Sequence, residues 1–223
     1  MSKLLVDEIR SADRSVSSSA NMTFADDGST TIASGTLSAG TLGNSVKLPQ
    51  GSIANVHCSS PSSVSEQTIA NTEATVLTGS SVSYTPATGA RYVVYEYRCQ
   101  VADKSPANAI WSGKLQLNDG GTYRDFIQRV WGGRFYTAEL GTSSIVTVAI
   151  DLANLDTYFT SISSSHDWKT KAGGTTAFSA NTLRVVGGQY SDSFTVGLHQ
   201  LYNIAGGGGL SNMSPTTIIY SVM

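Results

Sequence analysis

The residues best suited to chemistry in this chain are three histidines, and none has a partner at a useful spacing. His57, His166 and His199 form no HxxxH, HExxH or HxH pattern of the kind that binds a metal. His166 precedes Asp167, and a carboxylate can help a histidine act as a base. Adjacent side chains on a strand point to opposite faces, however, so Asp167 would point away from the His166 ring there. We expect His166 to be a loop histidine. The sequence predicts no metal site and no catalytic histidine.

The sequence also lacks the motifs that would mark other catalytic groups. Serine is abundant, but no GxSxG motif marks a nucleophile. The four glycines at 206–209 lack the Lys and Ser/Thr of a phosphate loop and favour a hairpin tip. A glycan-cleaving enzyme needs two carboxylates about 5 to 10 Å apart, and nothing in the sequence pairs Glu96 with Glu139. We expect a protein that is not an enzyme and has no cofactor; a glycan-cleaving β-sandwich is the alternative.

Two cysteines, Cys58 and Cys99, are the only ones in the chain. Their spacing matches no zinc or redox motif. Free cysteines are usually buried. The expectation is a reduced pair of thiols in the core.

Aromatic side chains beside arginines are better candidates for binding. Tyr123 with Arg124, and Arg134 with Tyr136, place a ring next to a guanidinium group. Such pairs can stack on sugars or anchor a protein interface, although they also suit strand edges. Trp168, in the polar stretch HDWKTK, is the best single candidate for an exposed contact.

Composition indicates a β-rich chain. Only 13% of the 223 residues are charged and 22 are glycines, while Ser and Thr fill the stretches between apolar runs. The net charge of −2 and the lack of any Lys/Arg run argue against nucleic-acid binding and against binding to an anionic membrane surface. The opening MSKLLVDEIR is not a secretory signal, and no run approaches the roughly 18 apolar residues of a membrane span. We expect synthesis in the cytoplasm and no membrane insertion.

Alternating apolar and polar residues predict an antiparallel sheet. The run VVYEYRCQV at 93–101 places its apolar residues on one side, and 111–117 alternates in the same way before the turn signal NDGG. Many strands with frequent turns favour a sandwich or jelly roll. Further strands are expected at 53–58, 75–82, 124–131, 135–140, 145–152, 183–186, 194–202 and 216–223. Turns are expected at WGGR, ELGTSS, AGGT and VGGQY, and one short helix at DLANLDTYFTSI.

The first 51 residues have a different texture. The repeat GTLSAGTLGN at 35–44 lies in a run without charge, with Ile32, Leu37 and Leu42 five residues apart. That spacing fits neither a helix nor a strand. Few apolar residues are available for an independent core. We therefore divide the chain into an N-terminal segment, 1–51, and a β-sandwich domain, 52–223.

Four stretches of the chain have a recognisable sequence and order: the opening LLVDEI, the segment VKLPQGSIANV, the run SEQTIANTEATVLTGSSVSYTPATGARYVVYEYRCQVA and the ending SPTTIIYSVM. Together they resemble the short virion appendage proteins of tailed bacteriophages, especially phages of marine and freshwater bacteria. The resemblance implies a homotrimeric structural protein of the virion, with a jelly-roll-like sandwich head behind an extended N-terminal arm. The arm would bind tail or major capsid proteins. The head of a tail fibre would contact a host surface glycan or protein; capsid decoration and a free lectin-like module are the alternatives.

A trimer would also explain the repeat. Three copies of a thin segment can wind about one axis, so that Ile32, Leu37 and Leu42 each meet their symmetry mates in a small apolar layer. Glycines between the layers would allow close backbone approach. The alternative is a flexible linker whose repeat is accidental.

Overall fold

The computed structural model describes residues 8–9, 22–24, 30–32, 50–103, 110–134, 142–190, 196–203 and 209–223. The chain divides into two compact units, Met1–Asn44 and Ser45–Met223. The first contains an antiparallel sheet with the order β1 (Glu8–Ile9), β2 (Met22–Phe24), β3 (Thr30–Ile32). Ile32 ends β3, whereas Leu37 and Leu42 lie outside the described residues. The apolar layers expected in a trimer stay a prediction.

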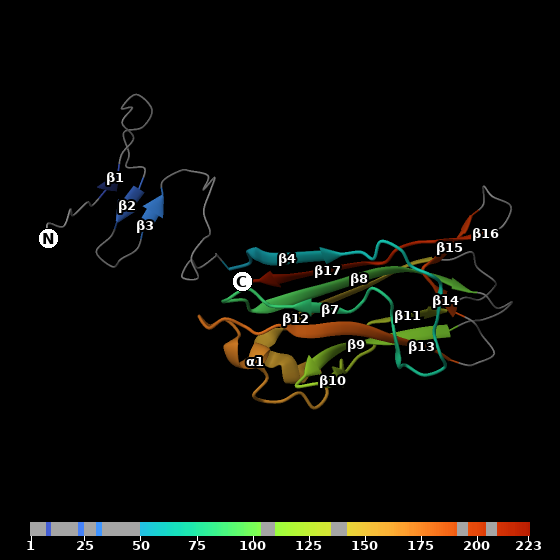
Figure 1. Ribbon diagram of the computed structural model, residues 1–223. Helices are drawn as coiled ribbons and strands as arrows, with labels where there is room; N and C mark the ends of the chain where they lie inside the picture. Colours follow the sequence, from blue (N-terminus) through green and yellow to red (C-terminus); the bar gives the residue numbers. More distant parts are fainter. Residues whose placement is uncertain are drawn as a thin grey trace, which may run out of the picture. The chain divides into compact units, whose positions relative to one another are not determined.

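Two antiparallel sheets form the second unit and face each other across one core (Figure 1). In the first sheet, β17 lies between β4 and β8, and β12 pairs with the other side of β8. The short β14 pairs with the far end of β8, and β5 pairs with β14. The bounds are β4 (Ile53–Ser59), β5 (Gln67–Thr68), β8 (Tyr92–Asp103), β12 (Thr142–Asp151), β14 (Val196–Leu198) and β17 (Thr216–Val222).

The second sheet is built around the pair β9 and β13. Two short strands, β10 and β11, share the outer edge of β9, while β6 and β7 share the outer edge of β13. A separate hairpin joins β15 to β16. The bounds are β6 (Thr75–Val76), β7 (Val82–Tyr84), β9 (Ile110–Asp119), β10 (Thr122–Asp125), β11 (Trp131–Arg134), β13 (Asn181–Gln189), β15 (Gln200–Asn203) and β16 (Gly209–Asn212). The predicted all-β, antiparallel class is confirmed.

Apolar and polar residues alternate along the strands, and the apolar side chains form the core, as the sequence predicted. On β8, Tyr95 and Tyr97 are fully buried while Arg98 faces outward, and β9 alternates in the same way. The buried hydroxyls donate to backbone oxygens, Tyr95 to Ser80 at 2.6 Å and Tyr97 to Thr78 at 2.9 Å. Burial raises the pKa of both hydroxyls, so they remain protonated donors. These bonds tie β8 to the loop between β6 and β7.

Two predicted turns, WGGR and VGGQY, are wrong because their glycines lie inside strands. WGGR is β11, and VGGQ ends β13. A side-chain carbon at Gly133 would stand 2.5 Å from Cζ2 of Trp111, and one at Gly187 would stand 2.9 Å from Cζ3 of Trp131. Glycine is needed at these two positions for close packing against two tryptophans, and neither glycine forms a turn.

The predicted turn NDGG is confirmed. Gly120 and Gly121 join β9 to β10 with φ of +60° and +94°, values that suit glycine. Asn118 accepts a hydrogen bond from the Gly121 N–H at 2.8 Å. The AGGT turn is confirmed as well, with Gly173 at φ +67°.

Three predicted strands are interrupted. The segment 75–82 holds β6 and the first residue of β7, separated by a turn at Gly79 with φ +77°, and 194–202 breaks at His199 with φ +64°. The segment 124–131 spans the connection between β10 and β11. Residues 135–140, also predicted as a strand, lie outside the described residues.

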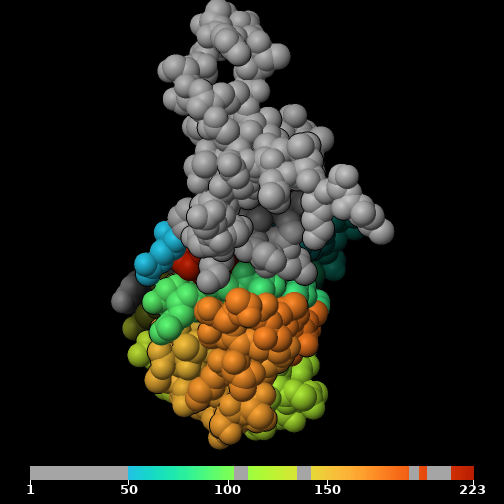
Figure 2. Space-filling model, turned by 90° about the vertical axis from the view of Figure 1, so that its left-hand side faces the viewer, coloured from blue at the N-terminus to red at the C-terminus, as the bar shows by residue number. Residues whose placement is uncertain are grey.

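The segment after β12 caps the sandwich. A 3-10 helix, η1 (Leu152–Thr157), replaces the longer predicted helix, because Phe159 already bridges to Phe126. A one-turn helix that the sequence did not predict, α1 (Asp167–Lys171), follows. Figure 2 shows this segment, in yellow and orange, over one end of the sandwich.

Candidate functional site

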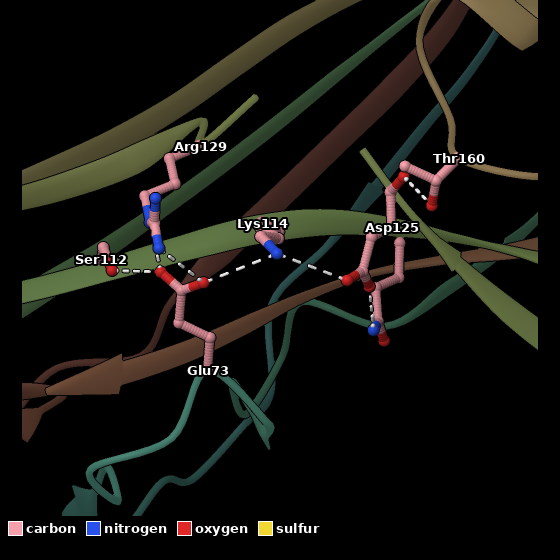
Figure 3. Close-up of polar contacts among 7 residues, drawn as sticks. Glu73, Ser112, Lys114, Asp125, Arg129 and Thr160 are labelled. Carbon is pink, nitrogen blue, oxygen red and sulfur yellow. Dashed lines mark hydrogen bonds and ion pairs between the residues drawn. The ribbon is translucent and has the colours of Figure 1, made fainter. Parts of the chain in front are cut away.

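A chain of ion pairs lies on the outward face of the β9–β13 sheet (Figure 3). The Glu73 carboxylate accepts hydrogen bonds from Arg129, with Nε at 2.5 Å and Nη2 at 3.2 Å, and from the Ser112 hydroxyl. The Lys114 ammonium lies 3.6 Å from Glu73 and 3.4 Å from Asp125, so it bridges two carboxylates. Ser112 and Lys114 point outward because the alternate residues of β9 face the core.

Electrostatics make this network a poor catalyst. Burial alone would raise the pKa of Glu73, but the hydrogen bonds from Arg129 and Ser112 and the charges of Arg129 and Lys114 outweigh it, so the pKa is lowered. A general acid needs a pKa near the working pH. Asp125 is held in position by Lys114 and by a 2.7 Å hydrogen bond from the Gln116 amide. The arrangement keeps Glu73 ionised and fixes both carboxylates in place, which serves to join strands and loops.

Sequence reasoning missed this network. Ser112 and Lys114 stood on the predicted polar side of their strand, but Glu73 and Arg129 lie in loops that are 56 positions apart. No local pattern links residues at that distance, and only the sheet pairing brings them together.

Two predicted contact residues, Tyr123 and Arg124, are engaged within the chain. The Arg184 guanidinium lies 3.4 Å from the centre of the Tyr123 ring and donates to Gln116 at 2.8 Å. Arg124 Nε lies 3.5 Å from the Asp119 carboxylate. Neighbours on one strand, Tyr123 and Arg124 point to opposite sides, so the structure does not join them in one site.

The prediction that Trp168 is exposed is wrong. Trp168 is fully buried in α1, where its ring N–H donates to the Ser179 carbonyl at 3.0 Å. Its ring meets Tyr84 edge-on, with 6.4 Å between ring centres. Asp167 and the residues after Trp168 lie on the outer side of one helical turn, while His166 at the N-cap and Trp168 are buried. Polar neighbours in the sequence therefore do not imply that the Trp168 side chain has polar surroundings.

The remaining contact candidates lie at or beyond the end of β11. Arg134 is exposed on that strand. Tyr136 and Glu139 lie outside the described residues. Glu96 accepts a 2.6 Å hydrogen bond from Arg98.

The three histidines lie on separate elements. His166 caps α1: its Nδ1 accepts from the Trp168 N–H at 3.2 Å, which leaves Nε2 to donate to the Asn118 carbonyl at 3.3 Å. His57 is exposed on β4. His199 is fully buried, and neither ring nitrogen has a hydrogen-bond partner among the described residues. Burial lowers the pKa of His199 to about 4, so it is neutral at physiological pH.

The expected pair of core thiols is only half correct. Cys99 is buried on β8, and burial raises its pKa to about 12. Cys58 is exposed on β4, an edge strand that the core covers on neither face. Both thiols are free, and only Cys58 is open to reagents.

A hollow of about 200 Å³ opens on the outward side of the first sheet. It is lined by Arg98, Cys99, Gln100, Ser143, Ser144, Ile145, Met213, Ser214 and Thr216. Arg98 is 57% exposed, and the Ser143 and Ser144 hydroxyls accept hydrogen bonds from Gln100 and Trp131. One guanidinium and several hydroxyls beside apolar Ile145 and Met213 are the groups with which proteins hold a small polar ligand such as a sugar.

Within the described ranges, no three His, Cys, Asp or Glu side chains gather in a way that could hold a metal ion. No helix in that part of the chain has the length and apolar character to cross a membrane.

Comparison with known proteins gives structural likenesses but no match in sequence. No family model matches the chain, and no curated protein matches it in sequence. Among solved structures, the fold is similar to a chain in the structure of infectious bursal disease virus, Gx strain, with a TM-score of 0.35 and 11% sequence identity. The match covers 83% of this chain and 42% of that chain, so this chain spans less than half of its length.

Proposed function

We propose that the chain is a non-enzymatic structural protein of a bacteriophage virion, with a jelly-roll head behind an N-terminal attachment segment. The observation that carries the proposal is the strand order. Grouping short strands that continue one another gives eight strand positions along the chain: β4/β5, β6/β7, β8, β9, β10/β11, β12, β13 and β14/β17. Numbered in that order, the first sheet reads 1-8-3-6 and the second reads 2-7-4-5.

This order is what a jelly roll requires. A jelly roll is a long hairpin that wraps into two sheets, so position 1 pairs with 8, 2 with 7, 3 with 6 and 4 with 5. The corresponding antiparallel pairs here are β4–β17, β7–β13, β8–β12 and β9–β10. Jelly rolls are common in viral capsid and lectin domains, and the sequence resembles phage appendage proteins.

A structural role is also supported by how the charged groups are used. The negative charges of Glu73 and Asp125 are balanced by the positive charges of Arg129 and Lys114 in the ion-pair network. Asp151 receives two hydrogen bonds from Arg91, at 2.7 and 2.9 Å, which join the start of β8 to the end of β12. Carboxylates bound in this way stabilise the fold and are unavailable for acid–base chemistry.

The specific role we propose is a homotrimeric tail-fibre-type appendage whose head contacts the host surface. The N-terminal segment, with Ile32, Leu37 and Leu42 on the trimer axis, would bind a tail or major capsid protein. If it binds capsid and the head lies flat on the shell, the chain is a decoration protein.

Antibody labelling of purified phage particles tests this proposal and separates the two locations. Gold particles at the tail support a fibre, and labelling over the head supports decoration. A protein that lacks residues 1–44 should be missing from the particles. If the full chain is absent from purified virions, the proposal fails.

A second candidate, glycan binding, is favoured by the hollow at Arg98. The test is titration with a panel of neutral and acidic oligosaccharides, followed by ligand-observed NMR. Arg98→Ala should weaken binding of any acidic sugar at least tenfold, whereas Arg134→Ala should not. Absence of binding across the panel would remove this candidate.

A further inference from the structure

The outward face of the β4–β17–β8–β12 sheet carries rows of apolar side chains that the described structure leaves uncovered. Residues that pair across neighbouring strands form rows on this face. The row nearest the C-terminal end of β17 contains Ile53, Val222 and Tyr92. Ile53 is 59% exposed and Tyr92 is 40% exposed. The inward residues of β17 are fully buried, so Val222 and its outward neighbours belong to the opposite side of the sheet.

A second row continues this apolar surface. Tyr220 pairs with Val94, and Val94 pairs with Ala149. On the β4 side, a bulge brings Val56 next to Tyr220, and Val56 is 63% exposed. The bulge is fixed because Asn55, at φ +52°, is hydrogen-bonded through its carbonyl to the Tyr84 hydroxyl at 2.7 Å.

The third row adds one charged residue. Cys58 pairs with Ile218, and Ile218 pairs with Glu96, whose carboxylate accepts from Arg98 at 2.6 Å. The charged residues at the outward positions of the four strands in the described chain are Glu96, Arg98 and Asp151, and Asp151 is buried and paired with Arg91. The other sheet differs, because its outward face carries the ion pairs of Glu73, Lys114 and Asp125.

The edge next to this face lacks the usual protection. Sheet edges in soluble proteins are commonly guarded by Lys, Glu or Pro. β4 has the sequence IANVHCS, with no charge and no proline, and among described strands it pairs only with β17. Exposed apolar residues that are contiguous, as they are here, mark interaction surfaces, whereas scattered ones do not.

We propose that a second copy of this chain covers this face, related by a two-fold axis, with Ile53, Val56, Ile218 and Tyr220 at the centre of the contact. In a two-fold contact the same patch meets itself, so it must be complementary to itself in charge. The patch meets this condition: its charges form two ion pairs, Glu96 with Arg98 and Asp151 with Arg91, and the rest is uncharged. A partner with a strongly basic or acidic surface would have no such match.

The contact is independent of how the N-terminal segment assembles. If that segment forms trimers, the two-fold joins heads from two trimers into a six-chain particle of dihedral symmetry. If it does not, the contact gives a dimer. In either case, loss of the contact halves the mass of the assembly, so failure of the virion proposal and failure of this contact are separate results.

Light scattering on the full-length chain tests the contact. Val56→Asp places a carboxylate in the centre of each patch and should halve the measured mass. The matched control is Ile127→Asp, which changes an apolar residue of similar exposure, 53%, in the loop between β10 and β11. An unchanged mass in Val56→Asp, a threefold drop, or an equal drop in the control would each overturn the proposal.

Cys58 gives a second measurement that needs no destabilising variant. Its side chain lies in the third row, while the other thiol, Cys99, is buried. Alkylation of wild-type protein by N-ethylmaleimide should be at least tenfold slower at high protein concentration than after dilution below the dissociation constant. A rate that does not depend on concentration would show that the face is open and would overturn the proposal.

Discussion

Single side chains in this protein are explained by what surrounds them in space. Trp168 follows a histidine and an aspartate and precedes a lysine, yet it is fully buried against Tyr84 and His166. It is among the largest fully buried side chains and links α1 to the core. The tryptophan therefore contributes to stability and is not available for contact with a ligand.

Trp168→Ala should lower the free energy of unfolding by about 3 to 5 kcal/mol, the usual cost of deleting a large buried aromatic side chain. Urea unfolding monitored by circular dichroism measures it. Tyr190→Ala is the control, because Tyr190 is 76% exposed and its loss should cost less than about 0.5 kcal/mol. Equal effects would mean that Trp168 is not a core residue.

His199 predicts how stability depends on pH. Its pKa is about 4 in the folded chain and 6.5 ordinarily, so between these values the unfolded chain binds a proton that the folded chain does not. The free energy of unfolding should therefore fall as the pH falls from 6.5 to 4. His199→Asn should flatten that dependence, and asparagine tolerates the positive φ of this position. Urea midpoints at several pH values measure the slope, and an unchanged slope in the variant would contradict the assignment.

At the scale of elements, glycines show how one residue type serves two purposes. Gly120 and Gly121 form the turn that the sequence predicted, because NDGG between two alternating runs is a strong local signal. Gly188 lies inside β13, where a side-chain carbon would collide with the backbone of Thr72. Local sequence cannot separate these cases, because the colliding group belongs to a distant loop.

Gly188→Ala should destabilise the fold by about 1 to 3 kcal/mol, since a strand and a loop must move apart. Thermal unfolding measures the change. Ser83→Ala, at an exposed position on β7, is the control and should have little effect. If Gly188→Ala were as stable as the control, the close contact between β13 and the loop would not exist.

At the scale of the whole molecule, the second unit contains the apolar core that the described residues form. All residues of that core lie between Ile69 and Ile219, within Ser45–Met223. A fragment of residues 45–223 should therefore fold and melt within a few degrees of the full chain. Calorimetry of both proteins measures this, and an unfolded fragment would show that the first unit is needed for the sandwich.

The sequence by itself determined the all-β class, the alternation on β8 and β9 and the turns at NDGG and AGGT. Each of these depends on residues close together in the chain, such as Tyr95 and Tyr97 with their two-residue period. Tertiary structure alone decided the burial of Trp168, the strand glycines at 133 and 187, the ion pair of Glu73 with Arg129 and the apolar outward face around Val56. The reason is physical: these features arise between residues that only the wrapping of the two sheets brings into contact, and no local pattern encodes that contact.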